Sequence, residues 1–246
     1  MKRSFDPAVL EMMDRPQPVS AELERDLERL RQLNRWFGSY RLVLRFVSRW
    51  IQPGTRARIL DLATGSGDIP RLIADYAREI RAKVEIDALD RQAATLEIAR
   101  KLSITYPEIH YREADILEWN SAEPYDVTLC TLALHHFSDE EAVTLLRRCR
   151  ESSRRFVLVS DLRRGVLLQG GVYLLTALIF RESMTRYDAR LSAARAFSFT
   201  EMRDLALRAG WKDFGRKKFR FARQAIWLEK VPRTLMPLHE NLKHGC

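Results

Sequence analysis

Between residues 58 and 160, short runs of apolar and β-branched residues alternate with stretches that have helical spacing. We expect strands at Arg58–Leu62, Val84–Leu89, Ile109–Arg112, Asp126–Leu132 and Phe156–Ser160, and helices at Asp68–Arg81, Gln92–Ser103 and Glu140–Glu151. Alternation of this kind is typical of βαβ units. It predicts a doubly wound α/β fold, in which helices cover both faces of a mostly parallel sheet.

The segments on either side of this alternation follow other patterns. Residues 1–54 begin with an irregular arm that contains prolines and continue in two helices, the first capped by Ser20. Residues 165–195 are typical of a helical insertion, and two β-like runs, near Trp211–Phe221 and Ala225–Glu229, bring the number of strands to seven. We expect an N-terminal arm or lid over residues 1–54, a core over residues 55–230 and a tail over residues 231–246.

The charge is distributed unevenly along the chain. Its 42 Lys and Arg and 33 Asp and Glu give a formal net charge of +9, and residues 154–246 alone carry 19 basic and 8 acidic side chains. A basic segment can bind nucleic acid, an anionic membrane or an acidic partner. The commoner alternative is a solvated surface, which we expect for Arg163-Arg164, Arg216–Lys218 and Arg220–Arg223.

Cysteine usage and the apolar stretches narrow the class of protein. The three cysteines show no Cys-x-x-Cys or Cys/His spacing, so we expect neither a disulfide framework nor a metal site. The first residues lack the apolar core of a signal peptide. Val166–Phe180, the longest apolar stretch, is shorter than the roughly 18 residues of a transmembrane helix. These features predict a cytoplasmic protein.

The sharpest local feature is a turn of small residues, Ala63–Gly67, that follows Asp61 at the end of the first expected strand. Glycine permits positive φ and lets a ligand approach the backbone, and a helix N-terminus offers free N–H groups. Asp90 ends the second strand, where an acidic side chain can accept hydrogen bonds from ribose hydroxyls. Asp115 follows the third strand, so these groups meet at the carboxyl edge of the sheet. A dinucleotide and S-adenosylmethionine both fit such an edge.

Over about residues 55–165 the chain resembles the class I S-adenosylmethionine-dependent methyltransferases. The motifs that carry the resemblance are Asp61-Leu-Ala-Thr-Gly-Ser-Gly67, Asp90, Glu113-Ala-Asp-Ile116, and Tyr125-Asp-Val127 leading to Leu134-His-His-Phe137 on the fourth strand. Ala63 departs from the pattern, because many members have Gly there. Pro70 stands where a dinucleotide fingerprint has its third Gly, so that alternative fits less well.

The resemblance implies a Rossmann-like seven-stranded sheet and S-adenosylmethionine as the cofactor. It places Asp61 at the methionine amino end, Asp90 at the ribose, and Asp115 with Ile116 at the adenine. The implied cofactor site comprises Asp61, Ala63, Thr64, Gly65, Ser66, Gly67, Asp90, Arg91, Asp115, Ile116 and Leu132.

His135 and His136 are the candidate catalytic residues. Methyl transfer from a sulfonium is an in-line displacement, so the enzyme mainly aligns the acceptor and removes its proton. A nearby His can act as the base for a hydroxyl. Family members with a Leu-His-His segment can use the first His in this way, and Asp161 is placed to orient it. In the alternative interpretation, one His caps the strand end and the other forms a hydrogen bond in the core.

Other segments bear on the acceptor. The apolar insertion suits an apolar or aromatic acceptor, with Val172, Tyr173, Leu174, Leu175, Leu178, Ile179, Phe180, Met184, Tyr187 and Phe197. The same surface could instead pack the core or form a homodimer interface. Trp36, Phe37 and Tyr40 either close over the acceptor or pack the helices. Glu11–Asp14 and Leu30–Phe37 resemble one group of bacterial methyltransferases in secondary or quinone metabolism.

We therefore predict transfer of a methyl group from S-adenosylmethionine to a small phenol, polyketide or quinone precursor, with O-methylation favoured. C-methylation of a quinone-like ring is the alternative. A carrier protein or a membrane could deliver the acceptor to the basic C-terminal part. Nucleic-acid methylation is disfavoured, because Leu134–Phe137 stands in place of Asn/Asp-Pro-Pro-Tyr and Cys130 lacks a neighbouring Pro. The intact Asp and Gly motifs disfavour a binding protein without catalysis.

Overall fold

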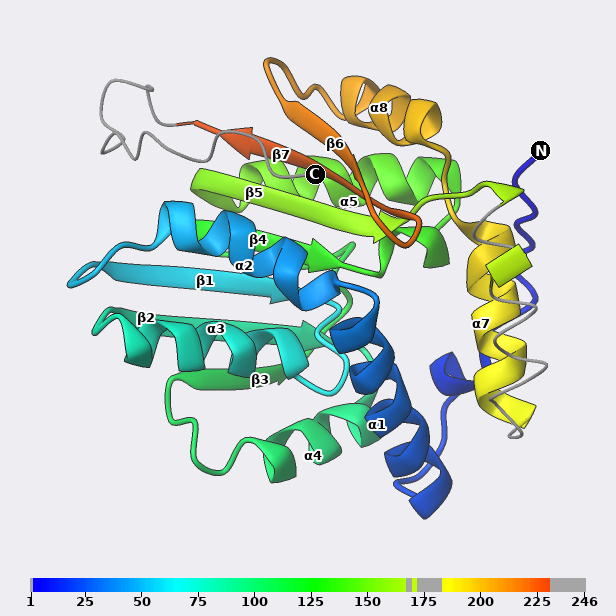
Figure 1. Ribbon diagram of the computed structural model, residues 1–246, viewed down its shortest axis with the longest axis horizontal. Helices are drawn as coiled ribbons and strands as arrows, with labels where there is room; N and C mark the ends of the chain where they lie inside the picture. Colours follow the sequence, from blue (N-terminus) through cyan, green and yellow to red (C-terminus); the bar gives the residue numbers. More distant parts are fainter. Residues whose placement is uncertain (1, 167–169, 172–182, 231–246) are drawn as a thin grey trace.

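A seven-stranded sheet in the order β3-β2-β1-β4-β5-β7-β6 forms the centre of the protein (Figure 1). The computed structural model describes residues 2–166, 170–171 and 183–230. The strands are β1 (Arg56–Leu62), β2 (Lys83–Asp90), β3 (Ile109–Glu113), β4 (Tyr125–Thr131), β5 (Ser153–Leu162), β6 (Gly215–Phe219) and β7 (Arg223–Glu229). β1 to β5 are mutually parallel, whereas β7 lies antiparallel between β5 and β6. The predicted seven-stranded, mostly parallel α/β fold is thereby confirmed.

Serine side chains cap several of the helices. The helices and 3-10 turns are η1 (Met12–Asp14), α1 (Ala21–Trp36), α2 (Ser39–Trp50), α3 (Asp68–Glu79), α4 (Ala93–Leu102), η2 (Leu134–His136), α5 (Asp139–Glu151), α7 (Ser183–Arg195) and α8 (Phe199–Arg208). Ser20 caps α1 as expected, because its Oγ accepts the N–H of Leu23 at 3.1 Å. Ser138 and Ser198 each form a capping box with a glutamate three residues on.

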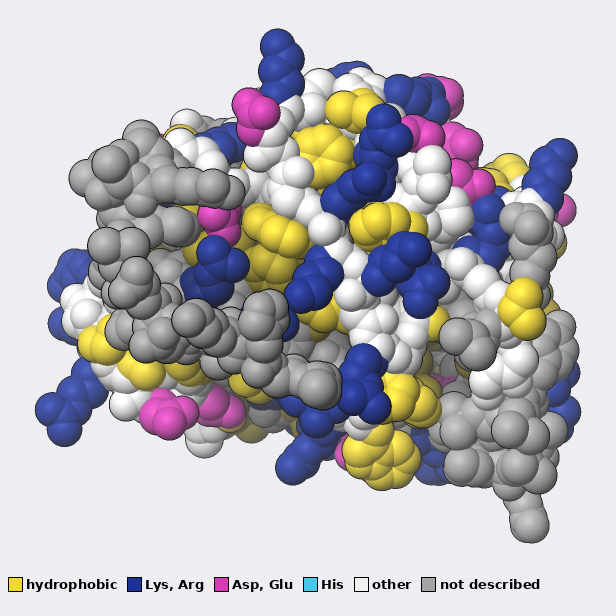
Figure 2. Space-filling view, turned by 45° about the horizontal axis from the view of Figure 1, so that its top comes forward, with side chains coloured by type: hydrophobic (Ala, Val, Ile, Leu, Met, Phe, Trp, Pro, Cys, Tyr) yellow, Lys and Arg dark blue, Asp and Glu magenta, His cyan; other side chains and the backbone are white. Residues whose placement is uncertain are grey.

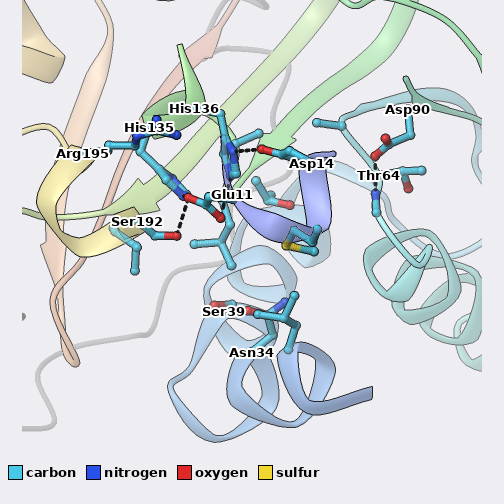
Figure 3. Close-up of a pocket in the computed structure, with 18 of the residues that line it drawn as sticks. Glu11, Asp14, Asn34, Ser39, Thr64, Asp90, His135, His136, Ser192 and Arg195 are labelled. Atoms are coloured by element: carbon cyan, nitrogen blue, oxygen red, sulfur yellow. Dashed lines mark hydrogen bonds and ion pairs between the residues drawn. The ribbon is translucent and has the colours of Figure 1, made fainter. Parts of the chain in front are cut away.

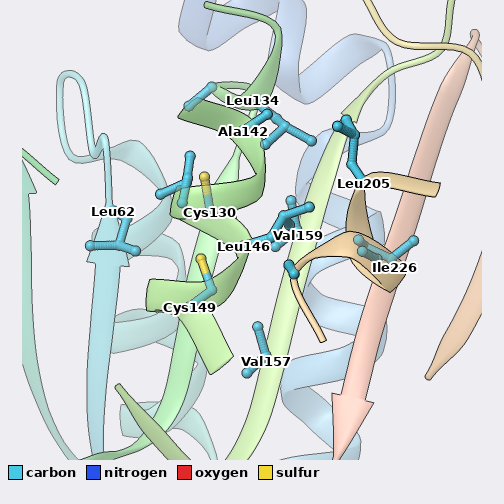
Figure 4. Packing of buried hydrophobic residues seen from close by; sticks show 14 of the residues in the cluster. Leu62, Cys130, Leu134, Ala142, Leu146, Cys149, Val157, Val159, Leu205 and Ile226 are labelled. Carbon is cyan, nitrogen blue, oxygen red and sulfur yellow. The ribbon is translucent and has the colours of Figure 1, made fainter. Parts of the chain in front are cut away.

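The two faces of the sheet are packed by different helices. Consecutive residues of a strand point to opposite faces. Ile59 of β1 therefore belongs to the cluster that includes Phe46 of α2 and Ile73 of α3. Leu60, the next residue, belongs to the cluster on the other face, which α5 and α8 complete. Figure 4 shows α5 lying over β4 and β5, with Cys149 near Cys130. Both thiols are buried, as the sequence predicts for Cys130.

The N-terminal arm and α7 lie beyond the carboxyl ends of the parallel strands, beside one another (Figure 1). A backbone hydrogen bond joins the arm to α7: the N–H of Ser4 donates to the carbonyl of Ala194 at 3.1 Å. α1 also packs against α7. The arm, α1 and α7 are distant from the strands in sequence, but together they cover the edge of the sheet at which doubly wound folds bind ligands. The expected apolar insertion residues Val172–Phe180 and the tail 231–246 lie outside the described residues.

The basic C-terminal part has two structural uses. Arg164 and Arg223 are buried, so the prediction that they lie on solvated faces is wrong. The guanidinium of Arg164 donates to the carbonyl of Ala196 at 2.8 Å and to Glu201 at 2.6 Å, which joins β5 to α8. Arg216–Lys218 are exposed on β6, an edge strand, where charged side chains oppose pairing with another strand.

Lys and Arg side chains are spread over the face seen in Figure 2, with hydrophobic and other side chains between them. The helices of the described ranges include none that is both long and apolar enough to cross a membrane.

Candidate active site

The turn after β1 is shaped by two glycines in left-handed conformations. Gly65 has φ 55° and Gly67 has φ 72°. A Cβ at Gly67 would lie 2.0 Å from the hydroxyl oxygen of Tyr111, so no other residue fits there without displacing that ring. Ala63 also has a positive φ, 57°, although it has a side chain. The glycine found there in many methyltransferases would adopt this conformation without strain.

Asp61, the residue before the last of β1, has a carboxyl group that no described residue pairs with. Its side chain is 1% exposed, and within the described residues neither carboxylate oxygen has a hydrogen-bond partner. The hydroxyl of Thr64 is likewise buried and unpartnered there. Burial raises the pKa of Asp61 to about 7. A buried carboxylate without a partner is costly, so this position calls for a cationic or hydrogen-bond-donating group.

Asp90 ends β2 and holds the turn in place. Its Oδ2 accepts the N–H of Gly65 at 2.8 Å, and its Oδ1 accepts the N–H of Gln92 at 3.0 Å. Burial raises the pKa of Asp90 above its ordinary value. The side chain of Arg91 is half exposed and lies 3.9 Å from Asp14.

The remaining predicted cofactor residues follow β3 and β4. Asp115 Oδ1 accepts the N–H of Leu117 at 2.8 Å, which shapes the loop, and Ile116 is buried beside it. Leu132 follows β4 with φ 57° and donates its N–H to the carbonyl of Ser160 on β5.

One cavity of about 740 Å³ connects these loops with the histidine pair. Of the residues proposed from the sequence, those that line it are Ala63, Thr64, Gly65, Ser66, Asp90, Arg91, Asp115, Ile116, Leu132, His135 and His136. Asp61, Gly67 and Asp161 are not among the lining residues.

His135 is held by Asp161 through two hydrogen bonds. Its Nδ1 donates to Asp161 Oδ1 at 2.7 Å, and its backbone N–H donates to Oδ2 at 2.8 Å. His135 lies in η2, beyond the end of β4, and not on the fourth strand as the sequence suggested. Strand β4 stops at Thr131 because Leu132 takes up a left-handed conformation. His135 and Asp161 are both buried, and Nε2 of His135 is available to another partner.

His136 is held by a carboxylate from the other end of the chain. Its Nδ1 donates to Asp14 Oδ2 at 2.7 Å (Figure 3). Burial alone would lower the pKa of His136, but the carboxylates of Glu11 and Asp14 outweigh it and raise the pKa to about 9. In turn, the hydrogen bond and charge of His136 hold the pKa of Asp14 below its usual range, against the effect of burial.

Glu11 completes this group and was not among the predicted site residues. It comes from the N-terminal arm, is 2% exposed, and accepts a hydrogen bond from Ser192 Oγ of α7 at 2.8 Å. Figure 3 shows Glu11 between Ser192 and His136. The only sequence signal was the resemblance of Glu11–Asp14 to a bacterial methyltransferase group, which assigned these residues no role.

Arg3 ties the arm to the histidine segment. Its guanidinium donates to the carbonyl of Phe137 at 2.6 Å and to that of Arg195 at 2.6 Å, and it stacks on the ring of Phe197. The arm is therefore part of the cavity wall in this structure.

The rest of the cavity wall is mostly apolar. The apolar residues of the arm, α1 and the later loops that line it include Phe5, Leu10, Met13, Leu30, Leu33, Phe37, Phe137, Leu162 and Phe221. Of the three aromatic residues considered from the sequence, Phe37 lines the cavity and Trp36 is 61% exposed. Tyr40 instead donates to Asp68 at 3.0 Å at the start of α3.

Comparison with known proteins agrees with this arrangement. The model of a methyltransferase domain family matches residues 59–155, which run from β1 into β5. Residues 59–155 therefore match a methyltransferase domain. A stretch of 81 residues is 35% identical to a 2-phytyl-1,4-naphtoquinone methyltransferase of Thermosynechococcus vestitus. This stretch covers 33% of this chain and 35% of that protein. The match thus spans about a third of the relative's length.

Solved structures share the fold of this methyltransferase domain and the elements around it. An O-methyltransferase family protein from Burkholderia thailandensis has a TM-score of 0.64 at 13% identity, over 87% of this chain and 61% of that one. Human N-acetylserotonin methyltransferase, solved with S-adenosylmethionine, has a TM-score of 0.60 at 18% identity, over 85% of this chain and 56% of that one. Magnesium protoporphyrin IX methyltransferase from Synechocystis PCC 6803 has a TM-score of 0.56 at 14% identity, over 89% of this chain and 91% of that one.

Proposed function

We propose that this chain transfers the methyl group of S-adenosylmethionine to a hydroxyl oxygen of a small aromatic or apolar acceptor. The observation that carries the proposal is the continuity of one cavity, from the glycine turn after β1 to the histidine pair after β4. A transfer between two bound molecules needs both in one enclosed space, with the reacting atoms aligned. The relatives named above support the same chemistry on small molecules.

The residues at the sheet edge fit S-adenosylmethionine. The cofactor carries an ammonium group, and the buried carboxylate of Asp61 lacks a partner in the described chain. Asp90 lines the cavity where ribose hydroxyls would donate, and Asp115 with Ile116 lines the part assigned to adenine. When bound, the cofactor supplies an activated methyl group on a sulfonium. The protein has only to hold it, exclude water and ionise the acceptor.

His135 is the group that we propose to accept the acceptor's proton. Because Nδ1 donates to Asp161, the electron pair of the neutral ring is on Nε2. The pKa of about 9 leaves His136 protonated at neutral pH, so it is unsuited to act as the base. Its positive charge would instead stabilise a developing phenolate.

C-methylation of a quinone-like ring is the second candidate. The observation that favours it is the local similarity to a protein named as a naphthoquinone methyltransferase. Delivery of the acceptor by a carrier protein or membrane, and a homodimer, stay predictions.

The test is product formation with two panels of acceptors. The purified chain is incubated with S-adenosylmethionine and either long-chain phenols or quinols, and mass spectrometry and NMR locate the new methyl group. We expect a methyl ether on a phenol. A ring C-methyl product would select the second candidate, and absence of cofactor binding in calorimetry would overturn both.

A further inference from the structure

Three side chains from two distant parts of the sequence converge at the acceptor end of the cavity. Glu11, His135 and His136 each offer one ligand atom, and these atoms lie within 4.8 Å of one another. The two oxygens of Glu11 are divided between the rings: Oε1 is 4.0 Å from Nε2 of His135, and Oε2 is 3.9 Å from Nε2 of His136.

These distances leave a gap of the size of a metal ion. At 3.9–4.0 Å an oxygen and a nitrogen do not form a hydrogen bond. Two ligands bound at 2.0–2.2 Å to one ion lie roughly 3 to 3.5 Å apart, so the three groups need only a small inward movement to share one.

The surroundings orient the ligand atoms toward this gap. Nδ1 of His135 donates to Asp161 and Nδ1 of His136 donates to Asp14, both at 2.7 Å. In the neutral rings these bonds place the electron pair on Nε2, so an ion that binds there displaces the second proton of His136. The hydroxyl of Ser192 holds Glu11 Oε1 at 2.8 Å. A carboxylate behind each metal-binding histidine is the usual outer arrangement of a metal site.

Charge and burial favour a cation at the same point. Glu11 is 2% exposed and His135 is 3% exposed. The carboxylates of Asp161 and Asp14 contact the two rings, and Asp188 accepts the N–H of Met12 beside Glu11. A buried group of carboxylates is costly unless positive charge compensates it.

We propose that Glu11, His135 and His136 bind one divalent transition-metal ion, of the class of Zn²⁺, at the acceptor end of the cavity. Imidazole nitrogen with one carboxylate suits Zn²⁺, Fe²⁺ and Co²⁺. Three protein ligands leave a position open toward the cavity, as in catalytic metal sites. A hydroxyl bound there becomes more acidic, so with the ion present His135 is a ligand and not the base. Metal binding itself does not depend on the proposed methyl transfer.

Sequence spacing could not indicate this site, because Glu11 lies 124 positions before His135. The expectation that no metal binds rested on the spacing of cysteines and histidines within local segments. The arm brings the third ligand in only when it folds over the edge of the sheet.

The test uses the full chain and a cobalt probe. His239, His244 and Cys246, which lie outside the described residues, are first replaced by Ala, Ala and Ser so that metal bound by the tail is not counted. The chelator-treated protein is titrated with Co²⁺, read by visible d–d absorption, and with Zn²⁺, read by calorimetry. We expect one ion per chain.

The variants separate this site from adventitious binding. Glu11→Gln keeps the shape and removes the charge, and Asp14→Asn removes the outer carboxylate. We expect each to weaken binding roughly tenfold or more. Glu22→Gln, an exposed glutamate in the first turn of α1, is the matched control and should bind like the parent. Circular dichroism checks that each variant is folded. Absence of binding at one equivalent, or binding that Glu11→Gln and Asp14→Asn leave unchanged, would overturn the proposal.

Discussion

Nδ1 of His135 lies 2.7 Å from Oδ1 of Asp161, although the two residues come from different strand ends. β4 and β5 pair in parallel with Thr131 opposite Ser160, so their carboxyl ends lie side by side. Asp161 is the residue after that pair, and η2 turns His135 back toward it. The parallel sheet thus presents the Nε2 atom to the cavity in one orientation.

In the metal-free protein, replacing His135 by Ala should slow O-methylation by about 10²- to 10⁴-fold, because the acceptor oxygen loses its base. The cofactor dissociation constant should stay near the parental value, since His135 is remote from the glycine turn. Steady-state kinetics and calorimetry measure the two quantities. His110→Ala, at a half-exposed histidine on β3, is the control for histidine loss. An unchanged rate in His135→Ala would contradict the role.

Asp61→Asn should abolish tight cofactor binding and yet stabilise the protein without cofactor. The pKa of Asp61 is raised from 3.8 to about 7 by burial, so the folded state favours the protonated carboxyl. Ionised Asp61 therefore lowers the free energy of unfolding increasingly as pH rises from about 4 to about 7. We expect Asn to add on the order of 4 kcal/mol at pH 8 and progressively less toward pH 4, measured by urea denaturation. Equal stability at pH 8 would contradict this account.

The same carboxyl predicts the pH dependence of cofactor binding in the parent protein. Only the ionised form attracts the ammonium group, so affinity should fall as pH drops below about 7. Calorimetric titrations of S-adenosylmethionine at several pH values measure this. The weak residual binding of Asp61→Asn should lack the transition, and a transition of equal size in the variant would assign it to another group.

Gly67→Ala should destabilise the protein by more than about 2 kcal/mol, because the new Cβ collides with Tyr111 in addition to occupying a left-handed conformation. Gly54→Ala is a matched control: Gly54 has φ 74°, and a Cβ added there would meet no atom within 4 Å. It should cost only about 1–2 kcal/mol. Thermal and urea unfolding compare the two, and equal losses would show that the contact with Tyr111 does not matter.

Asp188→Ala should loosen the N-terminal arm. Asp188 accepts the N–H groups of Met12 at 2.6 Å and Met13 at 3.1 Å, and removing it leaves both donors without this acceptor. We expect faster cleavage after Glu11 by a glutamate-specific protease, with a docking loss of about 1–3 kcal/mol. Asp204→Ala, at an exposed position of α8, is the control. Cleavage at the parental rate would mean that other contacts, such as those of Arg3, hold the arm.

Much of the fold could be predicted because its signals are local. The apolar runs at β1, β2, β4 and β5 are short and alternate with helical stretches, and the caps at Ser20 and Ser198 mark where helices begin. Ends of elements were less exact: β5 begins at Ser153, three residues before the expected Phe156. Side chains that bridge elements were missed, as with Arg164, whose partners lie more than 30 positions away.

The sequence by itself determined the α/β sheet, the glycine turn and the acidic residues at strand ends, because each depends on neighbours in the chain and on the side at which parallel strands finish. Only the tertiary structure decided what faces the histidine pair. Glu11 and Asp14 reach His136 because the arm crosses the carboxyl edge of the sheet and is held there by Arg3 and Asp188. Such a meeting depends on packing between distant segments, for which the local pattern of residues carries no signal.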